Sequence, residues 1–305
     1  MTTPPLETRA TAGASPRAWI KLVRPHQWVK NFFVLAPLLF SGRALNPDSQ
    51  RSAALAFAVF CLVASAVYVI NDVVDRAQDR AHPSKRNRPI ASGAIGVSAA
   101  LVLAMVLVVA GLALAWSVSP GVLGVTIAYL ALNLVYSVWI KHVVILDVFA
   151  ISAFFVLRLV AGAAAVDVRP SVWLVLCGGL LALYLGFAKR RHEIVLLGDG
   201  SSDHRAVLSQ YSTPFLDQLS VVLLAVTIVS YIMYTLESDT ARQLGGESLS
   251  YSTVFVLYGV LRYLYLVHTH KDGNPTETLL TDKSLLAAVT LWVVYCGFVL
   301  YRPQG

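Results

Sequence analysis

Residues 51–79 read RSAALAFAVFCLVASAVYVINDVVDRAQD, an apolar run that ends in a cluster of carboxylates. The apolar part has about the 20 residues that a helix needs to cross a bilayer, so it predicts a transmembrane span. Helical spacings of three and four place Asp72, Asp75 and Asp79 on one face where this span ends. Asn71 is expected beside Asp75 on that face.

This group of oxygens suits a hard cation. Clustered carboxylates repel one another unless a cation lies between them. Mg²⁺ takes oxygen ligands and usually shares them with a substrate phosphate. Acidic ligands at the edge of a membrane therefore indicate a Mg²⁺ site for chemistry on a diphosphate whose reaction partner is a lipid.

The composition places the chain among membrane proteins. Its 305 residues are 57% hydrophobic and only 13% charged, with a mean hydropathy of +0.66. Such a chain is too apolar for a soluble domain, and it predicts an all-α, polytopic membrane protein. The three cysteines lie inside apolar runs without metal or redox spacing, which predicts buried packing residues. Nine apolar runs are candidate spans: 28–45, 51–71, 97–118, 120–140, 143–166, 171–188, 215–237, 250–268 and 283–302.

The sequence predicts two regions, a short N-terminal segment and one membrane domain. Residues 1–17 are polar and rich in Pro and Thr, and we expect them to form a disordered cytoplasmic N-terminus. Residues 18–305 are expected to form one transmembrane domain without an internal repeat. Its first span, 28–45, is interrupted by Pro37.

Charge sets the predicted orientation. With the N-terminus in the cytoplasm, 17 of the 24 Lys and Arg residues lie in inside segments, five lie outside and two lie within spans. This bias predicts a protein of the cytoplasmic membrane with its N-terminus inside and its C-terminus outside. The net charge of +7 then reflects topology and anionic lipid, and it does not require a nucleic-acid partner.

In this orientation, polar residues from distant segments gather on the cytoplasmic face. They are the carboxylates at 72–79, the basic run 82–88, the pair Tyr136 and Lys141, and the stretch 189–193. A positive-inside bias predicts scattered Lys and Arg, but it does not predict three Asp at helical spacing. We therefore predict a central cavity that opens to the cytoplasm.

Four stretches resemble known enzymes. Residues 71–79 (NDVVDRAQD) resemble the aspartate-rich motif of the UbiA superfamily of intramembrane prenyltransferases. Residues 24–31 (RPHQWVKN), 68–72 (YVIND) and 82–91 (HPSKRNRPIA) resemble one branch, the decaprenyl-phosphate phosphoribosyltransferases of the arabinogalactan pathway. The resemblance implies the nine-helix UbiA fold, a catalytic site facing the cytoplasm, and phosphoribosyl diphosphate and a polyprenyl phosphate as substrates.

One position departs from the superfamily pattern. Ordinary members carry a second aspartate-rich motif after the sixth span, whereas residues 186–193 of this chain read GFAKRRHE. Lys189 and Glu193 are four residues apart and share a helical face. The basic run favours capture of phosphate by Lys and Arg over capture through a second Mg²⁺. A donor with an additional phosphate and an acceptor that is a lipid phosphate fit this charge.

The resemblance also implies a role for each candidate residue. Asn71 and Asp75 would hold Mg²⁺, and the catalytic group would be Asp72, Asp75 and Asp79. The residues expected to bind phosphoribosyl diphosphate are Lys30, Tyr68, Lys85, Arg86, Arg88, Lys189, Arg190 and Glu193. Those expected at the lipid phosphate are Tyr136, Lys141 and Arg158, with Lys30 as a further candidate. The lipid phosphate is already anionic, so it would attack the ribose C1 without a strong base.

Several of these residues also have structural interpretations. The carboxylates could pair with Arg76 and Arg80 in surface salt bridges, and Asn71 could cap a helix end. Tyr68 could belong to the aromatic belt at the membrane interface, and Lys141 could reach that interface by snorkelling.

Arg158 is a charge within a predicted span and therefore needs a partner. Asp147 lies about three helical turns earlier in the same span, which is too far for an ion pair. We therefore expect the partner on another helix.

Two other functions make different predictions for the sequence. A prenyltransferase that joins a prenyl diphosphate to an aromatic ring predicts the second aspartate-rich motif, which the sequence lacks. A lipid or ion transporter predicts inverted repeats and broken helices near the bilayer midplane, whereas the polar residues here cluster at one face. The sequence is compatible with a homo-oligomer and with isoprenoid chains of different length.

Overall fold

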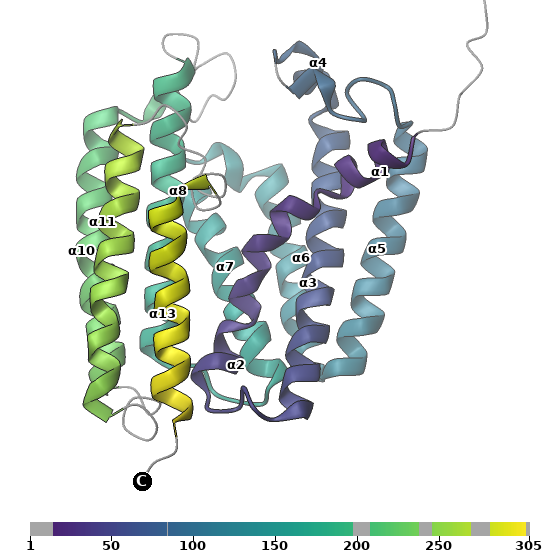
Figure 1. Ribbon diagram of the computed structural model, residues 1–305. Helices are drawn as coiled ribbons and strands as arrows, with labels where there is room; N and C mark the ends of the chain where they lie inside the picture. The colour runs from purple at the N-terminus through teal and green to yellow at the C-terminus, as the bar shows by residue number, and fades with distance from the viewer. Residues whose placement is uncertain (1–14, 84, 198–207, 238–245, 270–280, 303–305) are drawn as a thin grey trace, which may run out of the picture.

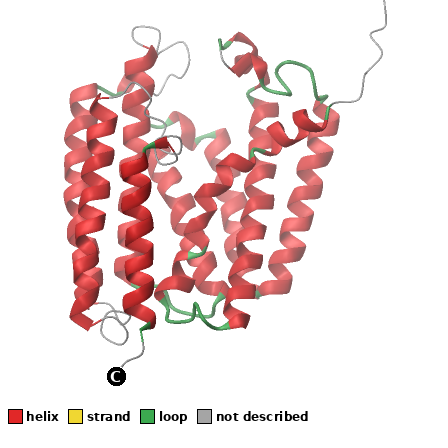
Figure 2. Ribbon diagram, viewed as in Figure 1, coloured by secondary structure: helices red, strands yellow, loops and turns green. Residues whose placement is uncertain are grey.

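Eight long helices form the bundle of this integral membrane protein. The computed structural model describes residues 15–83, 85–197, 208–237, 246–269 and 281–302, which contain no strand (Figure 2). Eight segments in these ranges are long and apolar enough to cross a membrane, which confirms the all-α, polytopic fold. The long helices are α3 (Pro47–Val74), α5 (Val97–Val118), α6 (Pro120–Val138), α7 (Leu146–Ala165), α8 (Val172–Leu197), α10 (Thr213–Glu237), α11 (Thr253–Thr269, preceded by η7, Gly246–Ser252) and α13 (Lys283–Tyr301).

The predicted span at 28–45 is a broken segment, so the count of nine regular spans is not confirmed. Residues 28–45 contain most of the 3₁₀ helix η1 (Pro25–Val34) and all of α2 (Ala36–Phe40), and the short helix α1 (Pro16–Val23) precedes them. Arg24, with a φ of 56°, separates α1 from η1 in a left-handed conformation. Pro residues near the start of η1 and of α2 lack the N–H that a continuous helix would use. In Figure 1 this segment runs obliquely from the end of the bundle near α4 (Arg76–Ala81) to the opposite end.

Local sequence sets the ends of several long helices. Ser119 caps α6, because its hydroxyl accepts the backbone N–H of Val122, and Pro120 occupies the first helical turn. Asp282 caps α13 in the same way by accepting the backbone N–H of Leu285. Residues 16 and 17, which the sequence predicts to be part of a disordered N-terminus, belong to α1. The rest of that prediction, residues 1–14, lies outside the described residues.

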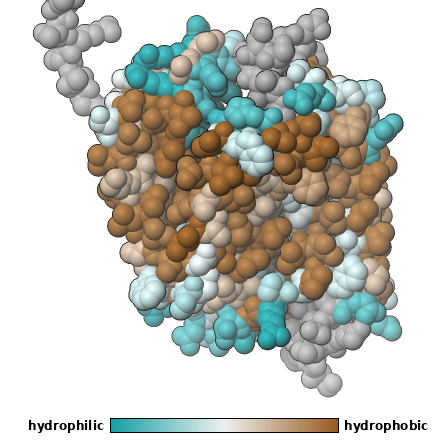
Figure 3. Space-filling view, turned by 180° about the vertical axis from the view of Figure 1, so that it is seen from behind, coloured by the Kyte–Doolittle hydropathy of each residue, from teal (hydrophilic) through white to brown (hydrophobic). Residues whose placement is uncertain are grey.

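The outer surface of the bundle is apolar. Figure 3 shows a hydrophobic belt across the middle of the face in view, with hydrophilic residues gathered toward its two ends. Large side chains on this surface include Met105, Leu134, Val294 and Phe298, each more than 60% exposed. Apolar side chains exposed over the length of a helix indicate contact with lipid.

The interior has several apolar clusters. One joins α3, α6 and α7 through residues such as Phe60, Tyr129 and Phe154. Others lie among α8, α10, α11 and α13, which stand together on the other side of the bundle (Figure 1). Cys61 and Cys296 are buried, as the sequence predicts, whereas Cys177 is only partly buried, and all three are free.

Gly162 on α7 lets η1 lie directly against the helix. A Cβ atom at this position would lie 1.9 Å from the backbone oxygen of Val34 and 3.2 Å from a ring carbon of Pro37. The obstacle is backbone, which cannot rotate away as a flexible side chain can. The close approach brings Asn31 of η1, which is 1% exposed, into the polar interior next to α7.

We expect Gly162→Ala to lower the free energy of unfolding by about 1–3 kcal/mol, because it overpacks the contact between η1 and α7. The matched control is Gly124→Ala on α6, where a Cβ would meet nothing within 4 Å. Thermal unfolding of both variants in detergent checks the prediction. A Gly162→Ala protein as stable as Gly124→Ala would contradict it.

Candidate active site

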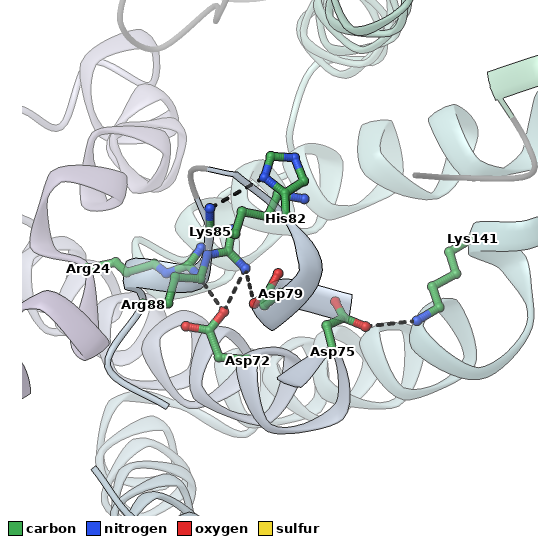
Figure 4. A network of polar contacts seen from close by, with 8 residues as sticks. All are labelled: Arg24, Asp72, Asp75, Asp79, His82, Lys85, Arg88 and Lys141. Atoms are coloured by element: carbon green, nitrogen blue, oxygen red, sulfur yellow. Dashed lines mark hydrogen bonds and ion pairs between the residues drawn. The ribbon is translucent and has the colours of Figure 1, made fainter. Parts of the chain in front are cut away.

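The aspartate-rich motif spans a break between two helices. Helix α3 ends at Val74, Asp75 lies in the turn, and Asp79 belongs to the short helix α4. The expectation that the three aspartates share one face is therefore wrong, because it assumed one continuous helix. Figure 4 shows Asp72 and Asp79 directed toward Arg88, whereas Asp75 is directed toward Lys141.

Asp72 and Asp79 are bound to arginines. Asp72 Oδ1 accepts hydrogen bonds from Arg24 Nη2 at 2.5 Å and from Arg88 Nη1 at 3.1 Å. Arg88 Nη1 also lies 2.7 Å from Asp79 Oδ2. The two carboxylates are only 2% and 3% exposed. In this structure Asp72 and Asp79 orient the guanidinium groups, and the direct catalytic role expected from the sequence stays a prediction.

The carboxylates do not form the alternative surface salt bridges with Arg76 and Arg80 in the described residues. Arg80 Nε donates to the carbonyl oxygen of Ala91, and the buried Nε of Arg76 has no hydrogen-bond partner in the described residues. The Arg24 side chain also covers the Tyr68 ring, with its guanidinium carbon 5.3 Å from the ring centroid. Arg24 therefore joins the expected donor-binding residue Tyr68 to the aspartate-rich motif.

Asp75 and Asn71 have a different environment. Asp75 Oδ1 lies 3.5 Å from Lys141 Nζ, and the Asp75 side chain is 37% exposed. Asn71 lies within α3, where it caps no helix end, and its Oδ1 accepts a hydrogen bond from Ser137 Oγ at 3.0 Å. Asp75 is thus the one carboxylate of the motif that no arginine holds among the described residues.

These oxygens suit a Mg²⁺ ion that is shared with a substrate. No group of three or more His, Cys, Asp or Glu in the described part of the chain is arranged to hold a metal ion. Mg²⁺ commonly binds through one or two carboxylates together with substrate phosphates and water. Asn71 and Asp75 fit that mode and do not form a complete cage.

Near the end of α8, Lys189 and Arg190 have different environments. Lys189 is 49% exposed, and its Nζ lies 4.0 Å from Glu193. Arg190 is 1% exposed, with Nε 2.8 Å from Asp147 Oδ2 and Nη1 2.7 Å from Glu193 Oε2. The expected contact of Arg190 with the donor does not fit this geometry, because two carboxylates already hold its buried side chain.

Arg158 lies in the interior and has partners on other segments, as expected. Its Nε donates to Asn31 Oδ1 at 2.8 Å, and Nη2 donates to Tyr129 Oη at 3.1 Å. Nη1 donates to the carbonyl oxygen of Phe154 at 2.9 Å. None of these partners is a carboxylate, and Asp147 pairs with Arg190 instead.

The remaining candidates lie around this group. Lys30 is on η1, within electrostatic range of Arg24 and Arg158. Tyr136 packs edge-on against Phe154, with ring centroids 5.7 Å apart. Lys85 and Arg86 are exposed on the short helix η2 (Lys85–Asn87).

The chain resembles known proteins along most of its length. The model of the UbiA prenyltransferase family matches residues 32–281. A relative from Mycolicibacterium smegmatis named decaprenyl-phosphate phosphoribosyltransferase is 33% identical, with 97% of each chain covered. A protein of the same name from Corynebacterium glutamicum is also 33% identical, over 92% of this chain and 86% of the relative.

A solved structure shares the fold. The UbiA homolog from Archaeoglobus fulgidus, bound to DMAPP and Mg²⁺, superposes with a TM-score of 0.71 and 18% sequence identity. The match covers 93% of this chain and 99% of that one. The family model and the relatives together give one conclusion: this chain belongs to the UbiA prenyltransferase family.

Proposed function

We propose that this protein transfers 5-phosphoribosyl from phosphoribosyl diphosphate to a polyprenyl phosphate such as decaprenyl phosphate, with Mg²⁺ as cofactor. The observation that carries the proposal is the unbalanced positive charge inside the bundle. Neither Lys30 nor Arg158 contacts a carboxylate in the described residues. Charge within a membrane is costly unless an opposite charge accompanies it, and substrate phosphates would supply that charge.

The names of the relatives support the same substrates. The positive-inside bias supports a site that faces the cytoplasm, where a soluble phosphorylated sugar would enter. The apolar belt supports an acceptor whose isoprenoid chain lies in the bilayer (Figure 3).

The donor would bind at the aspartate-rich end of α3. Arg24 and Arg88, held by Asp72 and Asp79, present fixed N–H donors to phosphate oxygens. Exposed Lys85, Arg86 and Lys189 would add positive charge where the donor enters from the cytoplasm. Tyr68 lies beside Arg24, and Glu193 lies beside Lys189. Asn71 and Asp75 would hold Mg²⁺, which when bound neutralises the diphosphate leaving group.

The acceptor phosphate would lie on the other side of Asp75. Lys141 and Tyr136 would orient the lipid phosphate, and Arg158 and Lys30 would balance its charge from the interior. A lipid phosphate oxygen then bonds to the ribose C1 as the bond from C1 to diphosphate breaks, and diphosphate leaves with the bonding electrons. Since the attacking oxygen is already anionic, the main contributions are positioning and electrostatic stabilisation.

A turnover assay tests the proposal. Purified protein in detergent is given radiolabelled phosphoribosyl diphosphate, polyprenyl phosphate and Mg²⁺, with EDTA and Asp75→Ala as controls. Label is expected to enter the lipid phase only with wild-type protein and Mg²⁺. No transfer of label, together with transfer of a prenyl diphosphate to an aromatic acid, would replace the proposal by an aromatic prenyltransferase activity.

The incomplete metal site gives a separate prediction. We expect Mg²⁺ alone to show no saturable heat of binding to the protein at sub-millimolar concentration, since Asn71 and Asp75 supply few ligands. In the presence of phosphoribosyl diphosphate, saturable binding is expected, and Asp75→Asn is expected to abolish it. Isothermal titration calorimetry measures both, and micromolar binding of Mg²⁺ to the protein alone would contradict the shared site.

A further inference from the structure

The turn between η3 (Ile140–His142) and α7 contains a strained residue. Ile145 has a φ of 72° and a ψ of −51°, and the N–H of Leu146 donates to the carbonyl oxygen of Val144 at 2.8 Å. This is a γ-turn with positive φ, which is rare even for unbranched side chains. A β-branched residue in this conformation persists only when its surroundings hold it there.

The Tyr211 hydroxyl holds the turn from outside it. The N–H of Ile145 donates to Tyr211 Oη at 2.6 Å, and Tyr211 Oη donates to Asp147 Oδ1 at 2.9 Å. Arg190 Nε donates to the other oxygen of Asp147 at 2.8 Å. Burial raises the pKa of Tyr211 well above its usual value, and the charge of Asp147 raises it further, so the phenol is protonated and can be the donor.

The same turn carries Lys141 toward Asp75. Backbone hydrogen bonds join His142 to Trp139, Val143 to Ile140 and Asp147 to Val143, so residues 139–147 form one continuous hydrogen-bonded segment. The 3.5 Å separation between Lys141 Nζ and Asp75 Oδ1 therefore depends on how this segment is anchored to α7 and α8.

We propose that Tyr211 is a positioning residue for Lys141, acting through the γ-turn at Ile145; this rests on the proposed function. The Tyr211 ring packs against Phe187 and Phe215, and a phenylalanine would keep those contacts. Within the described residues, the hydroxyl makes two hydrogen bonds, one with the N–H of Ile145 in the turn and one with Asp147 in the first turn of α7. Tyr211→Phe thus removes the positioning contact and leaves the packing in place.

The matched control is Tyr263→Phe. Tyr263 on α11 is 5% exposed, close to the 6% of Tyr211. Its hydroxyl has no hydrogen-bond partner in the described residues. The two substitutions therefore delete the same atom from equally buried rings, and only one of them breaks a connection to the site.

Hydrogen exchange is the first readout. We expect Tyr211→Phe to accelerate amide exchange at least tenfold in a peptide that covers residues 143–147, while Tyr263→Phe leaves that peptide at the wild-type rate. Unchanged exchange in Tyr211→Phe would overturn the inference. Hydrogen exchange does not depend on turnover, so it tests the role of Tyr211 in the turn even if the wild-type protein does not transfer phosphoribose. Absence of that transfer would contradict the proposed function alone.

Kinetics are the second readout. Tyr211→Phe is expected to lower kcat/KM for phosphoribosyl transfer by on the order of 10–100-fold, the scale of a displaced catalytic contact. The double variant with Lys141→Ala should be no slower than Lys141→Ala alone, because the hydroxyl acts through that lysine. Tyr263→Phe should leave the rate of either background unchanged. Independent, multiplying losses for Tyr211→Phe and Lys141→Ala would overturn the positioning role.

Discussion

Asp75→Asn is expected to lower kcat/KM for phosphoribosyl transfer by on the order of 10³-fold, the upper end of losses seen when one electrostatic group is removed from an active site. The free energy of unfolding should change by less than about 0.5 kcal/mol, as it does for most surface substitutions. The Asp75 side chain is 37% exposed and has one 3.5 Å ion pair with Lys141, which contributes little to stability. Its carboxylate is available to a metal ion and a diphosphate.

The matched variant is Asp72→Asn, three residues away in the same motif. Asp72 is 2% exposed and accepts hydrogen bonds from Arg24 and Arg88. Loss of its charge leaves two guanidinium groups with only Asp79 to balance them, so we expect a lower unfolding midpoint as well as lower activity. Thermal unfolding and kcat/KM, measured on both variants, separate a substrate-facing aspartate from a supporting one. Near wild-type turnover by Asp75→Asn would contradict the assignment.

The sequence predicted the parts of the fold that depend on local composition. A bilayer requires about 20 apolar residues in succession, so the run at 51–71 identifies α3 without knowledge of its neighbours. Pro37 indicated an interruption in the segment at 28–45, but the close contact between Val34 and Gly162 could not be predicted. That contact joins residues far apart in the chain, and no local sequence pattern predicts it.

The candidate site shows the same division. Spacing arithmetic identified the aspartate-rich motif, yet it assumed a continuous helix and missed the break at Asp75. Arg24 was recognisable within the motif at 24–31, but its pairing with Asp72 crosses 48 residues. The hydrogen bond between Tyr211 and Asp147 was not predicted, since it joins residues that are 64 positions apart in the chain.

Arg190→Ala is expected to lower the free energy of unfolding by about 3–5 kcal/mol, the cost of leaving a buried charge without its partner. Asp147 is fully buried, and without Arg190 only the Tyr211 hydroxyl would remain near its carboxylate among the contacts described. Lys189→Ala, one residue away and half exposed, is expected to change stability by less than about 0.5 kcal/mol and to raise KM for the donor.

A second substitution identifies the cause of that loss. Asp147→Asn placed in the Arg190→Ala background removes the uncompensated charge, so it should recover part of the lost stability, although the same change in the wild-type protein should destabilise it. Chemical denaturation in mixed micelles measures all four proteins. If Arg190→Ala were as stable as wild type and only raised KM for phosphoribosyl diphosphate, Arg190 would be a donor ligand after all. The buried ion pair to Asp147 would then have to open when substrate binds.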